Sequence, residues 1–449
     1  MHLDYRYIDN DGLSASELGN ADKDGASGAS QYELRRARLG VKGKFAKYFN
    51  YEVVGNLPGT ATIDVAFLDF VKYDQVQLRV GKFKQPFGLE QLTSSNNIDF
   101  LERSYVDQTA PGKKLGTMIS GELRPGVTYA GSAYQVNDAE NNVDKEDMSY
   151  AGRATLNFAE IMGNKDAIYH VGFAGQNNSW STRPSTSSGS TGGTSTSGTL
   201  LSYRTPGRGL SNIFRAQVNG ATTVSGQSVL SDVAAQMDSK SYGLEGILAY
   251  NSFKFQGEFT KGDYRADYNS GQSVVDLENK AYYGEVMFLL TGEKYSGSYK
   301  KGVFSSIKPL KDLDLDNFSG LGAWEIGARY EAYDVSDAGI GGIGGTVANL
   351  AGARFQGTQN CSGSGKNSST AAGNSTTTGP QSGCSSGAST WTVGLKWILN
   401  PNLMVKAAYS RTRYDDAFYY YDIGSSSSSP IGGLMKTEDI LSMRGQYTF

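Results

Sequence analysis

Hydrophobic and polar residues alternate along most of this chain with a period of two. In the segment "YELRRARLGVKGKF" (residues 32–45), one set of alternate positions holds Arg36, Arg38, Lys42 and Lys44. The positions between them hold Ala37, Leu39, Val41 and Phe45. Successive side chains of a β-strand point to opposite faces, so the segment predicts a strand with one charged and one apolar face. Such a strand fits either a sheet over a soluble core or a wall whose apolar face meets lipid.

The same alternation predicts sixteen strands along the whole chain. They cover 2–8, 31–45, 49–57, 62–73, 76–83, 115–123, 127–136, 148–158, 167–177, 237–250, 252–264, 278–290, 322–336, 390–399, 403–415 and 437–449. An even number of strands is typical of single-chain barrels of the bacterial outer membrane.

The connections between these strands alternate between short and long. Short connections lie at 46–48, 74–75, 124–126, 251 and 400–402. Long connections lie at 9–30, 84–114, 137–147, 178–236, 265–277, 337–389 and 416–436. Short turns at one end and long loops at the other are typical of outer-membrane barrels. Two connections depart from this alternation, because 57–61 is short where a loop is expected and 291–321 is long where a turn is expected.

Aromatic residues at the ends of the apolar faces separate the two interpretations. Trp391 and Trp397 flank one apolar face, Trp324 and Tyr330 flank another, and Phe449 ends the last strand. Aromatic girdles of this kind meet lipid headgroups, and in lipid only a closed barrel pairs every backbone group of its strands. We therefore predict one all-β domain over 1–449, a 16-stranded antiparallel transmembrane β-barrel with short periplasmic turns and long extracellular loops.

The composition agrees with a barrel and excludes several other classes. Among 449 residues, 42 are Lys or Arg and 45 are Asp or Glu, and the resulting net charge of −3 implies no nucleic-acid partner. Apolar residues make up only 38% of the chain, which is little for a large soluble core. No apolar run approaches the roughly 20 residues of a transmembrane helix. The segments 178–236 and 337–389 are rich in Gly, Ser and Thr, and we expect both to be extracellular loops.

A barrel of this size encloses water, so its charged faces become the wall of a pore. Positive wall residues on this alternation are Arg36, Arg38, Lys42, Lys44, Arg79, Arg153, Lys254, Arg329, Lys396, Lys406 and Arg444. Negative ones are Glu52, Asp64, Glu122, Glu245, Glu258, Glu285, Glu325 and Glu331. The simplest interpretation of any one of them is a solvated or ion-paired residue. The four bases of 36–44 include no acid, however, and form a stripe about 27 Å long, so we predict that small anions pass along it.

The connection 84–114 differs from the other long loops because it carries apolar residues throughout. These are Phe87, Leu89, Leu92, Ile98, Phe100 and Leu101. We expect this loop to fold inward and narrow the pore, and the alternative is an outer loop packed on its neighbours. If it folds inward, candidates for the constriction are Arg103, Lys113 and Lys114, with Lys82 and Lys84 at its base.

The chain contains two cysteines, Cys361 and Cys384, within one Gly/Ser/Thr-rich segment. A disulfide between them fits an oxidising compartment. The alternative is two unpaired thiols, which would be open to oxidation in a polar loop. The sequence gives no indication of a metal ion or a cofactor.

Several stretches resemble the phosphate-selective porins O and P of Gram-negative outer membranes. They are "YELRRARLGVKGKF", "VGKFKQPFGLEQLTSSNNIDFLERS", "FLLTGE" at 288–293 and "GAWEIGARYEAYDVSD" at 322–337. The resemblance implies a homotrimer of sixteen-stranded barrels with an inward-folded third loop and a ladder of arginines that guides anions to a lysine-bearing constriction. It assigns Arg35 and Arg36 to the paired arginines of the family and Arg103 to the end of the loop. In this chain Glu102 and Asp107 lie beside these bases, whereas strongly phosphate-selective members concentrate lysine there.

Together these features predict a bacterial outer-membrane porin for passive diffusion of small solutes, with a preference for anions such as phosphate. Its expected partners are outer-membrane lipid, lipopolysaccharide and small anionic solutes. A general or sugar-type porin and a structural or adhesin barrel acting through its surface loops remain alternatives. An enzyme is not expected, because the only histidines are His2 and His170 and neither has an evident nucleophile and acid beside it in sequence.

Overall fold

A computed structural model gives the arrangement of most of the chain. It describes residues 1–12, 30–59, 61–136, 148–182, 197–210, 213–219, 222–224, 227–229, 235–268, 273–316, 319–342, 353–358, 373–375, 381–420 and 431–448. No helix within these ranges has the length and apolar character needed to cross a membrane.

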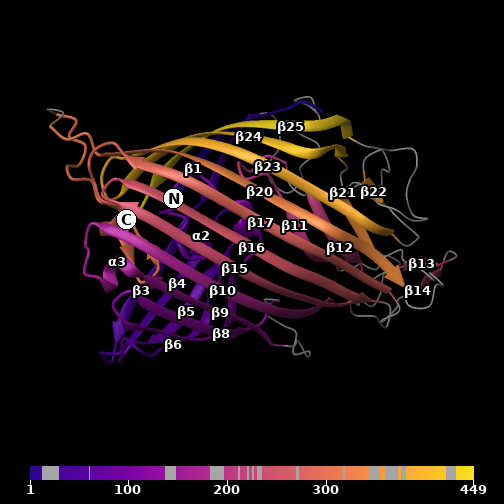
Figure 1. Cartoon of the computed structure of the whole chain (residues 1–449), viewed down its shortest axis with the longest axis horizontal. Coiled ribbons are helices and arrows are strands. Elements are labelled where there is room, and N and C mark those ends of the chain that lie inside the picture. Colours follow the sequence, from indigo (N-terminus) through magenta and orange to yellow (C-terminus); the bar gives the residue numbers. More distant parts are fainter. Residues whose placement is uncertain are drawn as a thin grey trace.

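The described strands form one large sheet that closes on itself (Figure 1). Its members are β1 (His2–Asn10), β2 (Ser30–Arg36), β3 (Arg38–Phe45), β4 (Phe49–Asn56), β5 (Thr62–Phe70), β6 (Gln77–Lys84), β7 (Lys113–Arg124), β8 (Val127–Tyr134), β9 (Ser149–Asn157), β10 (Ala167–Thr182), β15 (Ala235–Tyr250), β16 (Phe253–Tyr268), β17 (Ser273–Leu289), β20 (Ala323–Gly342), β23 (Gln381–Ile398), β24 (Leu403–Tyr420) and β25 (Ile431–Tyr447). Neighbouring members pair antiparallel, and β1 pairs with both β2 and β25. The predicted all-β antiparallel barrel is therefore confirmed.

The strand number differs slightly from the prediction. The sheet contains seventeen strand elements rather than sixteen, because the predicted strand over 31–45 is interrupted at Ala37. Its first half, β2, pairs with β1, and its second half, β3, pairs with β4. The two halves continue one another along the wall, so the interruption leaves the order of the barrel unchanged.

Burial follows the predicted alternation, with the apolar face outward. Side chains of β1 alternate between buried and more exposed along its length, and those of β9 do the same. On the outer face Trp391 is 60% exposed and Val41 is 64% exposed. Large apolar side chains that are exposed in regular rows are stable only against hydrocarbon, which is the environment of a membrane barrel.

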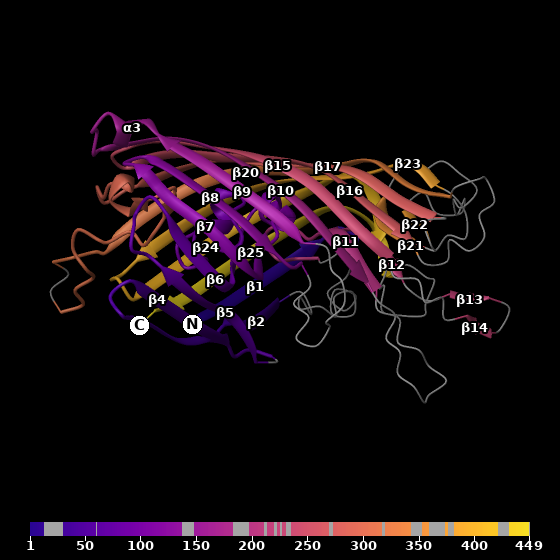
Figure 2. The same cartoon turned by 90° about the horizontal axis from the view of Figure 1, so that it is seen from below.

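The wall is low on one side and tall on the other (Figure 2). Strands β4, β5, β6, β8 and β9 have 8 or 9 residues, whereas β15, β16, β17, β20, β23, β24 and β25 have 16 to 20. The sequence pattern ended the tall strands too early, because the strands continue beyond their lipid-facing apolar rows. Asn177–Thr182, for example, pairs in register with Ala235–Lys240, and the apolar residues Trp180 and Met237 of these two stretches are buried.

Three segments lie inside the barrel. The first, between β6 and β7, contains α2 (Leu89–Leu92) and η1 (Tyr105–Thr109), and the second contains β11 (Ser197–Tyr203) and β12 (Phe214–Asn219). The third joins β17 to β20 and contains η2 (Tyr295–Ser298), β18 (Tyr299–Lys300) and β19 (Val303–Phe304). The predicted inward folding of the loop after β6 is thus confirmed. The remaining elements are α3 (Phe158–Ile161), β13 (Thr222–Val224), β14 (Gln227–Val229), β21 (Ala353–Thr358) and β22 (Gly373–Ser375).

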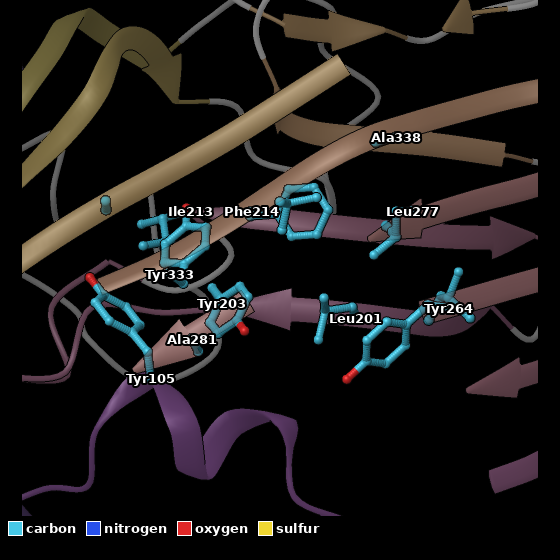
Figure 3. Packing of buried hydrophobic residues seen from close by; sticks show 14 of the residues in the cluster. Tyr105, Leu201, Tyr203, Ile213, Phe214, Tyr264, Leu277, Ala281, Tyr333 and Ala338 are labelled. Atoms are coloured by element: carbon cyan, nitrogen blue, oxygen red, sulfur yellow. The ribbon is translucent and has the colours of Figure 1, made fainter. Parts of the chain in front are cut away.

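The first two segments pack together against the inner wall. Tyr105 from η1, Tyr203 from β11 and Tyr333 from β20 meet at the centre of a buried apolar cluster (Figure 3). The rings of Tyr203 and Tyr333 stack with centroids 4.1 Å apart, and the ring of Tyr105 meets Tyr333 edge-on at 5.0 Å. This side of the lumen is therefore filled by side chains as in a soluble core.

The third segment accounts for the long connection 291–321, which the sequence pattern left unexplained. It folds back into the barrel at the short-turn end, where Tyr295 and Phe304 are buried. Both belong to the same apolar cluster as Phe100 of the first segment. The loop that enters from one end and the hairpin that enters from the other thus support each other inside the lumen.

Candidate functional site

A bulge in the second strand brings three arginines to the lumen. His2 lies opposite Arg36 and Leu3 lies opposite Leu34, which leaves Arg35 as an extra residue between them. An extra residue of this kind disrupts the alternation locally and re-aims the side chains beside it. Arg35 and Arg36 therefore do not take opposite faces, and the predicted stripe gains one charge.

Contacts across the lumen fix the positions of these arginines. Arg35 donates two hydrogen bonds to the Glu102 carboxylate of the loop, at 3.0 and 3.4 Å. Arg38 forms an ion pair with Asp64 of β5 at 3.0 Å. Arg36 lies close enough to Arg35, Glu102 and Arg38 to interact with their charges. The three guanidiniums thus face the loop after β6 from the wall.

The loop and its exit contribute further bases and acids to the same place. Lys113, at the start of β7, forms an ion pair with Asp64, so this one carboxylate lies between two cations. Arg103 lies 3.5 Å from Asp107 within the loop. We call these eight side chains the constriction, after the narrow part of the pore that the sequence predicts, and they are Arg35, Arg36, Arg38, Arg103, Lys113, Asp64, Glu102 and Asp107. Five bases against three acids leave a net charge of +2 there.

Two bases of the loop region also hold its backbone. The ammonium of Lys84 donates to the carbonyls of Gln91 at 2.5 Å and Thr93 at 2.9 Å. Arg103 donates to the carbonyls of Glu90 at 2.9 Å and Thr93 at 2.8 Å. Carbonyls at the end of a helix lack partners within it, so these cations stabilise the carboxyl end of α2.

Positive charge continues on both sides of the constriction. Towards the short turns, Lys42 and Lys44 are exposed and form no ion pair within the described residues. Towards the long loops, Arg6 donates to the backbone carbonyl of Arg208 at 3.4 Å, and Arg204 lies nearby. Burial, together with the charges of Arg204 and Arg35, lowers the pKa of Arg208 to about 9. The charges near Arg208 are thus mostly of its own sign.

Glu102 is the main counter-charge at this level. Burial alone would raise the pKa of its carboxyl group. The guanidiniums of Arg35 and Arg444 outweigh burial and hold the pKa of Glu102 well below its usual range. Glu102 is therefore ionised at neutral pH and neutralises part of the arginine cluster.

Six of the predicted wall cations lie between the wall and the inward segments rather than beside open lumen. Between 1% and 8% exposed are Arg153, Lys254, Arg329, Lys396, Lys406 and Arg444. Lys406 donates to the carbonyls of Ile98 at 2.5 Å and Phe100 at 3.2 Å. These cations satisfy loop carbonyls and buried carboxylates, so they anchor the inward segments and do not reach an ion in the water-filled path.

The other five repeat this arrangement. Arg329 pairs with Glu331 at 2.7 Å and with Glu90 of the loop at 3.1 Å. Arg444 bonds Asp4 and Glu102 at 2.7 and 2.6 Å, Lys396 pairs with Glu325, and Arg153 pairs with Glu245. Lys254, on the same face, reaches Asp99 of the loop at 2.6 Å.

Wall carboxylates anchor the loop in the complementary way. Glu258 accepts hydrogen bonds from the backbone nitrogens of Leu89 and Glu90, both at 2.7 Å. Glu331 accepts one from the nitrogen of Tyr105 at 2.9 Å. Backbone groups at the start of a short helix need such acceptors once they leave water.

The remaining candidates take different positions. Arg79 is inside, half-buried, with its guanidinium bonded to Asp69 at 2.6 and 2.8 Å and stacked 3.9 Å from the ring centre of Phe67. Lys114 donates to the carbonyl of Val136. By register Lys82 lies opposite Ala66 and Leu115, and it is half-buried.

The histidines and Cys384 have structural partners. His2 bonds the Asn96 side chain at 2.9 Å, and His170 bonds Tyr299 and Glu245 at 2.6 and 2.8 Å. Among the described residues, no group of three His, Cys, Asp or Glu side chains could hold a metal ion. Cys384 is disulfide-bonded, and Cys361 lies outside the described residues.

Sequence reasoning missed Arg6, Arg204 and Arg208. Arg6 shares the inner face of β1 with His2 and Asp4, so the alternation of "HLDYRY" carried a signal for it. Arg204 and Arg208 lie in "YRTPGRG", between β11 and β12. This segment has no alternation, and nothing in its sequence indicates that it turns into the barrel.

Comparisons with known proteins agree with this architecture. The sequence model of the phosphate-selective porin O and P family matches residues 13–449. Porin O of Pseudomonas aeruginosa is 25% identical over 328 residues, which cover 70% of this chain and 69% of that protein. The structure of OmpT, an outer membrane protein of Vibrio cholerae, has a TM-score of 0.51 at 10% identity and covers 100% of this chain and 95% of its own. An anion-selective porin from Comamonas acidovorans has a TM-score of 0.44 at 10% identity, with coverage of 100% and 99%.

The OmpT likeness, at 10% identity, concerns the fold alone. The family match, in contrast, covers nearly every residue and includes both the stripe and the loop after β6. We conclude that this chain is an outer-membrane barrel and belongs to the phosphate-selective porin O and P family.

Proposed function

We propose that the chain forms a water-filled channel for passive diffusion of small solutes and favours anions such as phosphate. The observation that carries the proposal is the net charge of +2 at the constriction. Charges that line a narrow pore set its ion selectivity, because an ion gives up part of its water there. A positive constriction therefore admits anions more readily than cations.

In this mechanism an anion passes a series of weak sites. It meets Arg204 and Arg208 on the side of the long loops, then Arg35, Arg36 and Arg38, and finally the exposed lysines 42 and 44. The planar fork of arginine suits two oxygens of a phosphate at once. Conduction requires each site to release the ion, and the competing carboxylates Asp64 and Glu102 weaken the sites enough for release.

The buried tyrosines argue against a sugar-type porin. Such a channel needs aromatic faces open to the solute. Tyr105, Tyr203 and Tyr333 are between 0% and 2% exposed and pack on one another. The aromatic residues inside this part of the barrel thus serve packing. A purely structural or adhesive barrel is the other alternative, and it predicts no conductance.

The proposal includes a membrane setting and an assembly. We infer a homotrimer, as the resemblance implied, with outer-membrane lipid and lipopolysaccharide around it and small anions as solutes. The channel requires no catalytic step, and the hydrogen bonds of His2 and His170 serve structural roles.

Planar-bilayer recording of the purified protein tests the proposal. In a KCl gradient the reversal potential of the wild type should lie towards the equilibrium potential of chloride. The reversal potential of the double variant Arg36→Glu, Arg38→Glu should lie towards the equilibrium potential of potassium. The control Arg265→Glu, Arg411→Glu changes two exposed outer arginines and should leave the reversal potential unaltered. An unchanged reversal potential in the first variant would remove the stripe from the mechanism. Comparing chloride, phosphate and a bulky anion then identifies the preferred solute.

A further inference from the structure

Two neighbouring short turns carry the same four-residue pattern. Phe45-Ala46-Lys47-Tyr48 leads from β3 towards β4, and Phe70-Val71-Lys72-Tyr73 leads from β5 towards β6. The backbone nitrogen of Val71 donates to the carbonyl of Tyr48 at 2.8 Å, so the turns are joined. Both lie at the end of the barrel where the chain termini are found (Figure 2).

The two lysines converge on one ring. The ammonium of Lys47 lies 5.2 Å from the ring centre of Tyr48, and that of Lys72 lies 5.7 Å from the same ring and 4.9 Å from the ring of Tyr73. Both lysines are exposed, and neither forms an ion pair within the described part of the chain. Two positive charges thus gather beside aromatic faces without a carboxylate between them. The nearest acid of these turns, Asp74, lies 3.6 Å from the ammonium of Lys301 instead.

The backbone of the first turn is unusual. Ala46 and Lys47 have φ angles of 44° and 66°, a left-handed conformation that residues with a Cβ rarely adopt. Asn or Gly would fill these positions with less strain. A strained turn that keeps a lysine at its tip suggests a role for that side chain beyond closing the hairpin.

An aromatic row lies directly beside the lysines on the outer face of the wall. Phe45, Phe49 and Phe70 are opposite one another in register, and each neighbouring pair of rings has centroids 5.3 Å apart. Aromatic residues of a barrel mark the level where hydrocarbon ends and headgroups begin. Short turns lie on the periplasmic side, so this level belongs to the inner leaflet.

We propose that Lys47 and Lys72 bind the phosphate of an anionic glycerophospholipid in this leaflet. The lysines supply two ammonium groups to the phosphate, while the phenylalanine row supports the first methylenes of the acyl chains. A free phosphate would use the lysines alone, and the row of three exposed or half-buried rings therefore favours the lipid. The site is outside the lumen, so it stands independently of the anion path.

Lipid titration of the purified full-length protein, followed by native mass spectrometry, tests this site. Phosphatidylglycerol should bind the wild type at least about tenfold more tightly than the variant Lys47→Gln, Lys72→Gln, given the known attraction of lysine to anionic lipid surfaces. The control Lys165→Gln, Lys294→Gln removes two exposed lysines at the same end and should bind like the wild type. Inorganic phosphate at the same concentrations should not displace the lipid.

The outcomes are distinct. Equal lipid affinity of the wild type and the Lys47, Lys72 variant would overturn the proposal, as would displacement of the lipid by inorganic phosphate, which would indicate a site for free anions. Loss of the oligomer in this variant would assign the surface to a subunit contact and would also overturn it. Conductance of the variant should equal that of the wild type, which shows that the barrel is intact.

Discussion

Asp64 offers a direct test of how the constriction selects ions. Its carboxylate lies between Arg38, at 3.0 Å, and Lys113. The substitution Asp64→Asn keeps the size of the side chain and removes one negative charge, so the net charge of the constriction rises from +2 to +3. The side chains of Arg38 and Lys113 are 31% and 20% exposed, so both stay in contact with water after the change.

The size of the effect follows from Coulomb's law. An anion about 6 Å from the freed charge gains about 0.7 kcal/mol at the dielectric constant of water. This corresponds to a rise of about threefold in anion occupancy and an equal fall for a cation. The ratio of anion to cation permeability should therefore rise by up to about tenfold, and less at salt concentrations where screening is strong. Loss of the two partly exposed ion pairs of Asp64 should cost the fold about 2 kcal/mol or less.

Single-channel reversal potentials in a KCl gradient measure this ratio. We expect Asp64→Asn to move the reversal potential towards the chloride potential. The control Asp166→Asn removes the same charge from an exposed pair with Lys294 at the short-turn end and should cause no shift. A reversal potential that stays unchanged, or moves towards potassium, would show that Asp64 and its partners do not face the ion path.

Three further predictions concern the loop and its anchors. Deleting residues 92–108 should raise single-channel conductance, because the segment occupies the lumen, and an unchanged conductance would contradict this position. Arg329→Met leaves the buried carboxylates of Glu90 and Glu331 without their cation, so it should lower the free energy of unfolding by about 3–5 kcal/mol, measured by urea denaturation in detergent. Because the pKa of Glu102 is depressed in the folded protein, its ion pairs stabilise the fold fully at any pH above the pKa of this carboxyl group in the unfolded chain. This stabilisation is lost only as the pH falls through the lower pKa of Glu102 in the folded protein. Selectivity should therefore be constant between about pH 5 and pH 7, and a change in reversal potential over that range would contradict the ion pairs of Glu102.

The sequence predicted the wall of the barrel well because a wall strand needs only alternation. Arg38, Lys42 and Lys44 lie on the lumen side as period two requires, since each position follows from its neighbours along the strand. The addition of Arg35 could not be predicted in this way. A bulge shifts the alternation by one residue, and the bulge is visible only in the pairing of His2 with Arg36.

The contents of the lumen were predicted less well, for a different physical reason. Lys42 and Lys406 have the same place in an alternating pattern, yet one is exposed and the other is 1% exposed. The difference comes from the carbonyls of Ile98 and Phe100, which lie about three hundred residues away along the chain and reach Lys406 only in the folded barrel. Period-two reasoning assigns a face but cannot say what covers that face.

This difference decides which charges act on a passing ion. A loop that leaves water must replace the hydrogen bonds of its backbone, and the inner wall of a barrel offers only side chains for this purpose. The cations of β20, β23, β24 and β25 and the carboxylates of β16 and β20 serve this role and are covered by the inward segments in doing so. Strands β2 and β3 are covered less, so part of their charge has no partner within the described wall. Selectivity should therefore depend on the few bases that the loops leave uncovered, and the nearly balanced charge of the whole chain does not oppose a preference for anions.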